Sequence, residues 1–271
     1  MRRRLDVELV RRGLARSRQH AAELIAGGAV LVGGAPAGKA ATQVGPEAAI
    51  KVGAADAGAG AYASRGGGKL AGALDVLAAR GRAPRVEGAV CLDAGASTGG
   101  FTDVLVRRGA RLVHAVDVGY GQLAWRLRQD RRVQVHDRTN VRHLGPGALD
   151  PAPGLVVADL SFISLRTVLP ALVAVAAPGA EFLLMVKPQF EVGKARLPRG
   201  GVVTSPEDRA AAVGAVAEAA LGLGLSVAGV VRSPLPGPSG NVEFFLCLRG
   251  AADPLALGGA ALPQAIAAEV V

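Results

Sequence analysis

A glycine-rich turn after an apolar run is the first candidate ligand site in this chain. Gly95, Gly99 and Gly100 follow residues 90–94, and a turn of this kind leaves backbone N–H groups beside a docked ligand. The spacing differs from the G-x-G-x-x-G of nicotinamide-binding proteins, and an acid, Asp93, stands two residues before the first glycine. A carboxylate there would repel a pyrophosphate and favours a ligand that carries positive charge, such as S-adenosylmethionine. The alternative is a plain glycine turn between a strand and a helix.

Acidic residues recur where the expected strands end. Asp93 ends the first strand, Asp117 ends the second, Asp137 follows the third and Asp159 follows the fourth. Ligands lie at the carboxyl ends of parallel strands, so we expect Asp117 to bind a ribose diol and Asp137 to lie near the adenine amino group. Any one of these acids could cap a helix instead, but capping alone explains four in series poorly. The predicted cofactor-binding residues are Asp93, Gly95, Ser97, Thr98, Gly99, Gly100, Phe101, Asp117 and Asp137.

Apolar strand-like runs alternate with helical runs from residue 90 onward. This alternation predicts an α/β fold with a parallel sheet covered by helices. Strands are predicted at residues 90–94, 112–116, 133–136, 154–158, 181–186, 226–232 and 242–248, and helices at 64–79, 103–108 and 207–221. Lys69 does not belong to a phosphate-binding loop, because Ala63 and Leu70 stand where that motif requires Gly and Ser or Thr.

A small basic unit precedes the sheet. Helices are predicted at residues 5–13 and 17–26, and strands at 29–32 and 49–52. Over residues 1–60, nine Lys or Arg residues oppose five Asp or Glu residues. Residues 53–63 have no apolar period and read as a linker.

The basic unit resembles the small RNA-binding module first named for a ribosomal small-subunit protein. The matching pieces are Arg4-Leu5-Asp6, Arg12-Gly13-Leu14-Ala15-Arg16-Ser17-Arg18 and Leu24-Ile25-Ala26-Gly27-Gly28-Ala29-Val30. Gly33-Gly34 replaces the usual Asn-Gly, which a turn tolerates equally well. The resemblance implies that Arg4, Arg12, Arg16 and Arg18 contact RNA, and the alternative is a solvated basic face.

Composition points to a polyanionic partner. The 271 residues carry a formal net charge of +9, and the isoelectric point is near 10.5, so nucleic acid and an anionic membrane are both open as partners. Cys91 and Cys247 lie in apolar runs, and neither a disulfide framework nor a metal site is expected. The amino terminus lacks the apolar core of an export signal, and no apolar run is long enough to span a membrane. A cytoplasmic protein is therefore predicted.

Five conspicuous segments are spread over nearly the whole chain: residues 64–70, 93–102, Asp137-Arg138-Thr139-Asn140, Asp159-Leu160-Ser161-Phe162-Ile163-Ser164 and Lys187-Pro188-Gln189-Phe190-Glu191. With these segments the chain resembles the TlyA family, the haemolysin-A-named ribosomal RNA methyltransferases, whose catalytic half is similar to the FtsJ (RrmJ) type of ribose 2'-O-methyltransferase. The resemblance implies a Rossmann-like domain of seven strands with the last one antiparallel, S-adenosylmethionine as cofactor, and 2'-O-methylcytidine in ribosomal RNA as product. It also implies a catalytic tetrad at Lys69, Asp159, Lys187 and Glu243. Gly67-Gly68 replaces bulkier residues of relatives, so we expect a looser helix start there.

The tetrad suits ribose chemistry. A ribose hydroxyl is a poor nucleophile at neutral pH, so a cation near its oxygen, here Lys187, must favour the alkoxide, while Asp159 holds that cation. Lys69 and Glu243 would complete the charge network. Glu243 stands at the start of a predicted strand, which fits only if that strand runs antiparallel. For Lys187, the alternative is a surface lysine at a strand end.

Other chemistries fit the sequence less well. Exocyclic-amine methylation usually requires two prolines that residues 159–162 lack, and base-carbon methylation requires a reactive cysteine, whereas Cys91 and Cys247 are expected to be buried. A membrane-active haemolysin and a non-catalytic RNA-binding assembly factor are the competing functions. The basic loop 194–209 could cover the RNA or be an ordinary exposed loop.

The domain organisation predicted from these observations has four parts. Residues 1–60 form an RNA-binding domain, residues 61–64 a linker, residues 65–250 the methyltransferase domain, and residues 251–271 a tail that is expected to fray.

Overall fold

The computed structural model describes residues 2–15, 17–26, 28–52, 62–193, 196–237, 239–250 and 252–270. These residues belong to two compact units, Met1–Arg65 and Gly66–Val271. The predicted RNA contact Arg16, most of the predicted linker and the first two residues of the basic loop 194–209 lie outside the described residues.

The first unit packs two helices against short strands. The helices are α1 (Leu5–Arg11) and α2 (Arg18–Ala26), and the Ser17 hydroxyl caps α2 by accepting the backbone N–H of His20 at 3.1 Å. The strands are β1 (Arg3–Arg4) paired with β4 (Gln43–Val44), and β2 (Val30–Val32) paired with β3 (Ala35–Pro36) and β5 (Ile50–Val52), all antiparallel. The predicted helices and strands are confirmed, and their apolar faces meet in one core that includes Leu5, Leu9, Leu24, Ile25 and Val30.

The second unit is built on a seven-stranded sheet with the order β11-β12-β10-β9-β6-β7-β8. The strands are β6 (Val90–Ala94), β7 (Leu112–Val116), β8 (Val133–His136), β9 (Leu155–Ala158), β10 (Glu181–Val186), β11 (Leu225–Arg232) and β12 (Phe244–Gly250). Strands β6 to β10 are mutually parallel, and β12 lies antiparallel between β10 and β11. The predicted Rossmann-like fold with an antiparallel last strand is confirmed.

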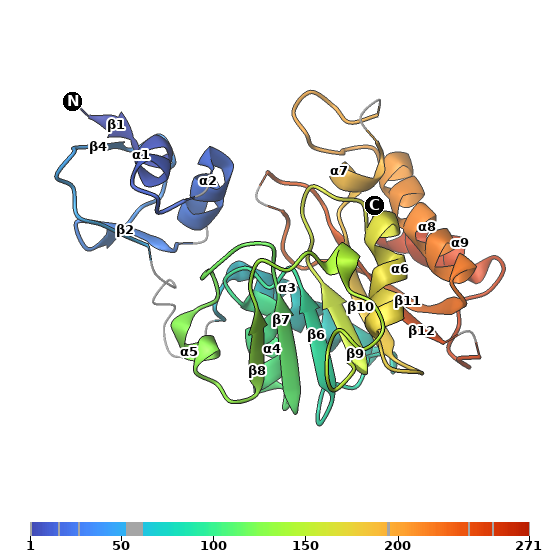
Figure 1. Cartoon of the computed structure of the whole chain (residues 1–271). Helices are drawn as coiled ribbons and strands as arrows, with labels where there is room; N and C mark the ends of the chain where they lie inside the picture. The colour runs from blue at the N-terminus through green and yellow to red at the C-terminus, as the bar shows by residue number, and fades with distance from the viewer. Residues whose placement is uncertain are drawn as a thin grey trace. The chain divides into compact units, whose positions relative to one another are not determined.

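Helices cover the sheet on its two faces, and the short helix α7 lies beyond the end of β10 (Figure 1). The helices of this unit are α3 (Arg65–Ala79), α4 (Gly100–Arg107), α5 (Trp125–Arg128), α6 (Leu165–Val175), α7 (Pro188–Glu191), α8 (Pro206–Gly222) and α9 (Ala261–Val270), with a 3-10 turn at Val141–His143. Helices α6, α8 and α9, yellow to red in Figure 1, share one face and bury Leu169, Val213 and Ile266 in the core they form with the sheet. The consecutive apolar residues of the central strands are buried on both faces, as expected for a covered parallel sheet.

Two expectations about local structure are wrong. Residues 261–270 do not fray, because α9 packs on α8 and β11 and buries Ile266 and Val270. The helix start at Gly67-Gly68 is not loose either, since α3 is regular from Arg65. A Cβ at Gly68 would lie 3.1 Å from Leu235 Cδ1, so the missing side chain lets the segment before β12 approach the helix closely.

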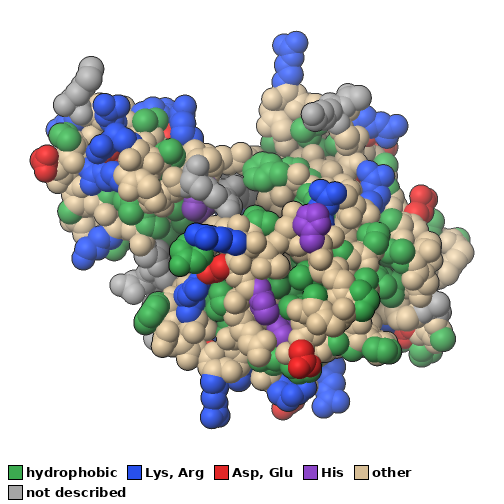
Figure 2. All heavy atoms as spheres, in the orientation of Figure 1, with side chains coloured by type: hydrophobic (Ala, Val, Ile, Leu, Met, Phe, Trp, Pro, Cys, Tyr) green, Lys and Arg blue, Asp and Glu red, His purple; other side chains and the backbone are tan. Residues whose placement is uncertain are grey.

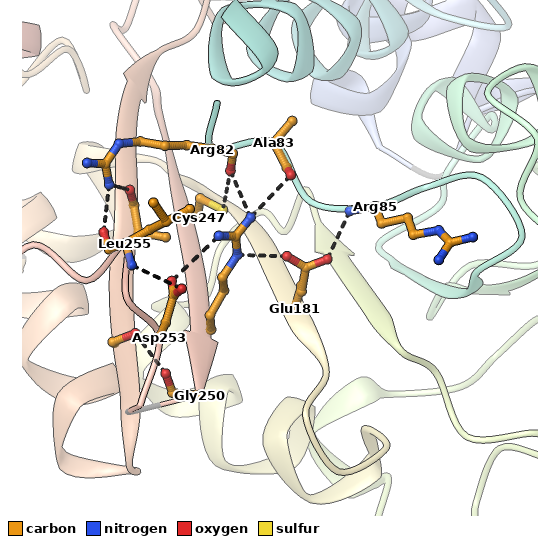
Figure 3. A network of polar contacts seen from close by, with 11 residues as sticks. Arg82, Ala83, Arg85, Glu181, Cys247, Gly250, Asp253 and Leu255 are labelled. Carbon is orange, nitrogen blue, oxygen red and sulfur yellow. Dashed lines mark hydrogen bonds and ion pairs between the residues drawn. The ribbon is translucent and has the colours of Figure 1, made fainter. Parts of the chain in front are cut away.

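A polar network closes the sheet edge opposite the carboxyl ends of the parallel strands (Figure 3). Arg249, near the end of β12, donates to Glu181 Oε1 at 2.7 Å and to the carbonyl oxygens of Arg82 and Ala83 at 3.2 Å. Cys247 lies within this network, and burial raises the pKa of its thiol to about 12. This edge therefore ties the chain after α3 to the sheet, and its thiol is unreactive.

Candidate active site

Lys187 and Asp159 meet at the carboxyl ends of two neighbouring strands. Strands β9 and β10 are parallel and in register, with Ala158 opposite Leu184, so the residues that follow each strand emerge at the same edge. Lys187 Nζ lies 2.5 Å from Asp159 Oδ1 and donates to the Ser161 hydroxyl at 3.1 Å. The ammonium is largely buried, at 11 % side-chain exposure, so its charge is weakly screened by solvent.

Lys69 and Glu243 form a second ion pair. Lys69 lies in α3, and Glu243 is the residue directly before β12. Both side chains are buried, at 5 % and 1 % exposure. The antiparallel register pairs Val186 with Phe244, which sets Glu243 across from Lys187 at the strand ends. The four residues predicted to form a tetrad thus make two cation–carboxylate pairs, and β12 runs antiparallel, as the position of Glu243 requires.

The glycine-rich turn approaches the same edge. Gly95 has a φ of +87°, and a Cβ there would lie 2.6 Å from the Asp159 carbonyl oxygen, so the turn requires glycine. Gly99, with a φ of +97°, ends the turn and precedes Gly100 and Phe101 in the first turn of α4. Ser97 also has a positive φ, of +48°, and its backbone N–H donates to Asp117 Oδ2 at 2.9 Å. The carboxylate of Asp117, directly after β7, therefore helps to fix the conformation of the turn.

Asp93 is the most deeply buried acid at this edge. The Thr102 hydroxyl donates to its Oδ2 at 2.6 Å, and burial raises the pKa of the carboxyl to about 7. Among the described residues its Oδ1 has no hydrogen-bond partner. An unpartnered carboxylate oxygen beside a glycine cradle fits a cationic, nucleotide-type cofactor.

The two remaining predicted cofactor carboxylates follow β7 and β8. Asp117 Oδ1 accepts the backbone N–H of Gly119 at 2.6 Å. Asp137 Oδ2 accepts hydrogen bonds from both terminal nitrogens of Arg128, at 3.0 Å, and from the backbone N–H of Gly121, at 3.2 Å. Both acids therefore organise the loops at the edge where a nucleoside would lie.

Two polar residues were absent from the sequence-based site. Ser161 hydrogen-bonds Lys187, and Glu191 caps the start of α6 from the loop that follows β10. Both stand inside the segments on which the TlyA resemblance rests, which is the signal that could have found them.

The predicted RNA-binding arginines differ in their surroundings. Figure 2 shows Lys and Arg side chains clustered on the first unit. Arg4 and Arg18 pair with Asp6 at 3.0 Å and keep 44 % and 62 % side-chain exposure. Arg12 is bound inside the unit by Glu8 at 2.8 Å and by the carbonyl oxygens of Pro46 and Ala48 at 2.7 and 2.8 Å. Arg4 and Arg18 are thus better placed than Arg12 to reach a phosphate.

The described part of the chain offers little to a metal-dependent, membrane-spanning or cysteine-based function. No group of three or more His, Cys, Asp or Glu residues in that part is placed to hold a metal ion. Among the same residues, no helix has the length and apolar character needed to cross a membrane. Burial raises the pKa of the Cys91 thiol to about 12, as for Cys247, so neither cysteine is a ready nucleophile.

The fold and this edge together define a Rossmann-like methyltransferase domain that follows a small basic domain. Comparison with known families agrees: residues 62–250 match the FtsJ-like methyltransferases, and residues 3–50 match the S4 domain. The chain belongs to the FtsJ-like methyltransferase family and, within it, to the TlyA group.

Relatives and solved structures cover most of the chain. It is 58 % identical over 250 residues to the 16S/23S rRNA (cytidine-2'-O)-methyltransferase TlyA of Mycobacterium tuberculosis, covering 92 % of this chain and 91 % of the relative. It is 39 % identical to the protein YqxC of Bacillus subtilis, over 90 % of this chain and 85 % of the relative. A haemolysin-named structure from Streptococcus thermophilus matches with a TM-score of 0.73 at 34 % identity, covering 98 % and 95 % of the two chains.

Proposed function

We propose that this chain is a ribosomal RNA methyltransferase that uses S-adenosylmethionine to methylate the ribose 2'-oxygen of cytidine. The observation that carries the proposal is the Lys187–Asp159 ion pair at the carboxyl edge of the sheet, beside the Gly95 turn. The relative named as a 16S/23S rRNA (cytidine-2'-O)-methyltransferase, at 58 % identity, supports both the substrate and the target atom.

Lys187 and Asp159 are proposed to activate the sugar hydroxyl. An ammonium beside the 2'-oxygen stabilises negative charge that develops there, and the carboxylate keeps the ammonium charged and oriented. Lys69 and Glu243 neutralise each other and fix the far side of the network, since a buried cation without a partner would be costly. When bound, S-adenosylmethionine would supply an electrophilic methyl group on its sulfonium, and the proton of the 2'-hydroxyl would leave to solvent water.

The cofactor is proposed to lie over the glycine-rich turn. The proposed contacts are Asp93, Gly95, Ser97, Thr98, Gly99, Gly100, Phe101, Asp117 and Asp137. Asp93 opposes the positive charge of the cofactor, Asp117 accepts from the ribose hydroxyls, and Asp137 lies toward the adenine.

The first unit is proposed to bind the ribosomal RNA. Its match to the S4 domain and the exposed guanidinium groups of Arg4 and Arg18 support this role. Ribosomal subunits are the proposed partners, which would place the protein in the cytoplasm.

A substrate that lacks one hydroxyl tests the target atom. An RNA with a single 2'-deoxycytidine at the mapped position offers no ribose nucleophile, so methyl transfer at that nucleotide should fall to background. Binding should change by about 1 kcal/mol or less, because phosphate contacts supply most of the affinity. Methylation of the deoxy nucleotide would place the acceptor on the base and reject the proposed role of the tetrad. No transfer to any RNA by the intact chain would favour the non-catalytic assembly factor.

A further inference from the structure

Glu191 joins the two loops that carry Lys187 and Asp159. It ends the short helix α7, and its side chain is 1 % exposed. Its carboxylate accepts the Ser164 hydroxyl at 2.6 Å and the Leu165 backbone N–H at 2.7 Å. Both donors stand at the start of α6, directly after the loop that carries Asp159. A carboxylate from the loop after β10 therefore anchors the end of the loop after β9.

Three other contacts bridge the same two loops. Lys187 pairs with Asp159 and hydrogen-bonds Ser161, and the rings of Phe162 and Phe190 lie 5.4 Å apart between their centroids. The contacts run in order along both loops, from the tetrad toward α6. The Glu191 contacts are the last of this series, at the end nearest α6. They therefore help to set the distance between the two loops.

Arg166 covers the Glu191 carboxylate from the outer side. Its Nε lies 3.3 Å from Glu191 Oε2, and a terminal nitrogen donates to the Glu191 carbonyl oxygen at 3.2 Å. Arg166 is 46 % exposed, so its ion pair is partly screened. The bond from the Leu165 backbone N–H is buried and the bond from the Ser164 hydroxyl is partly buried, so both are better protected from water than the arginine pair. These two bonds connect the two loops.

We infer that Glu191 is a positioning residue for the tetrad: it fixes the loop after β9 against the loop after β10 and so keeps the Lys187 ammonium at its working distance from Asp159. The inference rests on the proposed function, in which the position of that ammonium decides the rate. Misplacing a reacting group by about 1 Å can cost on the order of a hundredfold in rate. Glu191 acts through Lys187 and touches no reacting atom.

The test compares Glu191→Gln with Glu269→Gln in the full chain. Glutamine keeps the size of Glu191 but removes its charge and one acceptor oxygen. Glu269 in α9 is a matched control, because it also accepts a backbone N–H, from Arg232 at 2.7 Å, and pairs with an arginine, Arg80, at 2.7 Å. The measurements are kcat and its pH profile on ribosomal RNA, the affinity for S-adenosylmethionine by calorimetry, and Tm.

Glu191→Gln is expected to lower kcat by about tenfold or more while cofactor affinity stays within about twofold. The alkaline limb of the kcat profile should move to lower pH, because the Lys187 ammonium releases its proton more easily when the loops separate and it lies farther from Asp159. Glu269→Gln should lower Tm and leave kcat and its pH profile unchanged. These differences separate positioning from general stability.

Two results would overturn the inference. One is a folded Glu191→Gln enzyme with the kcat and pH profile of the unmodified chain, and the other is a Tm loss with no kinetic change. Should Glu191→Gln fail to fold, Ser164→Ala replaces it as the test, because it removes only the hydrogen bond between Ser164 and Glu191. This variant should show the same kinetic change on a smaller scale, and an unchanged kcat would reject the inference. Failure of the proposed function is recognised separately, because the unmodified chain would then not methylate the ribose.

Discussion

Lys187 Nζ lies 2.5 Å from Asp159 Oδ1, and the two residues follow the neighbouring parallel strands β10 and β9. The pair stands beside the Gly95 turn, where the backbone is too close to Asp159 for any Cβ. Lys187 is proposed to stabilise the nucleophile, and the Gly95 turn is proposed to hold the methyl donor. The two lie near each other but belong to different loops. Substitutions in one loop can therefore test the chemistry, and substitutions in the other can test cofactor binding.

Lys187→Ala should remove methyl transfer and leave the affinity for S-adenosylmethionine nearly intact. The ammonium is proposed to act on the nucleophile, so its loss affects the transition state and not the cofactor complex. Single-turnover transfer of labelled methyl groups to ribosomal RNA and calorimetry of cofactor binding measure the two effects. Retained turnover in this variant would move the chemistry to another residue.

Asp117→Ala should weaken S-adenosylmethionine binding by about 1 to 3 kcal/mol, because the ribose hydroxyls lose a charged acceptor. The Ser97 and Gly119 backbone N–H groups lose their partner as well. Asp130→Ala is the control, since Asp130 pairs with Arg132 outside the proposed cofactor site. Equal cofactor affinities for the two folded variants in calorimetry would reject the assignment of Asp117.

Asp93 should make the stability of the cofactor-free protein depend on pH. Burial raises the pKa of its carboxyl to about 7 from an ordinary value of 3.8, so between these values the folded chain holds a proton that the unfolded chain has released. Its contribution to the free energy of unfolding is therefore largest below pH 3.8 and declines as pH rises toward 7.

Asp93→Asn tests this dependence, because the amide resembles the neutral acid. The variant should gain Tm relative to the unmodified chain as pH rises from 5 to 8, and it should bind S-adenosylmethionine more weakly since the opposing negative charge is lost. A Tm difference that stays constant over this pH range would show that Asp93 is ionised in the folded protein throughout.

Arg4 and Arg18 should matter more for RNA binding than Arg12. Replacing both with Ala should lower the affinity for ribosomal RNA and reduce the salt slope by about 1 for each lost phosphate contact. Arg12→Ala should chiefly lower the stability of the first unit, because Glu8 loses one of its two arginine partners and the carbonyl oxygens of Pro46 and Ala48 lose a donor. Filter binding over a salt series measures both slopes.

Deleting residues 1–60 extends the same test to the whole basic unit. RNA affinity should fall and its salt dependence should flatten, while calorimetry should still detect cofactor binding by the remaining chain. A salt slope that neither the deletion nor the Arg4 and Arg18 substitutions change would mean that the arginines are only a solvated face.

The local pattern of residues was sufficient to predict most of the sheet. Residues 90–94, 112–116, 133–136 and 181–186 form strands with the predicted bounds. The first and the last of these are covered on both faces and need continuous apolar runs, which are visible in a short window. The edge strand at residues 133–136 instead alternates apolar and polar residues. The positions of Asp93, Asp117 and Asp159 could also be predicted from the local sequence. Each stands at or directly after the end of an apolar run, and in a parallel sheet the ends of these runs meet at the same edge. Residues 261–270 were mispredicted, because their helix is stabilised by packing on α8 and β11 and not by a strong local signal.

Which charges meet was decided by the tertiary structure. Lys69 and Glu243 are 174 positions apart, and spacing alone does not pair them; the family resemblance implied their roles, and the antiparallel insertion of β12 brings them together. The internal use of Arg12 and the capping of α6 by Glu191 were likewise not expected from sequence. Secondary structure follows from the apolar periodicity of neighbouring residues, whereas the partner of a buried charge depends on strand order and register, which are properties of the folded chain as a whole.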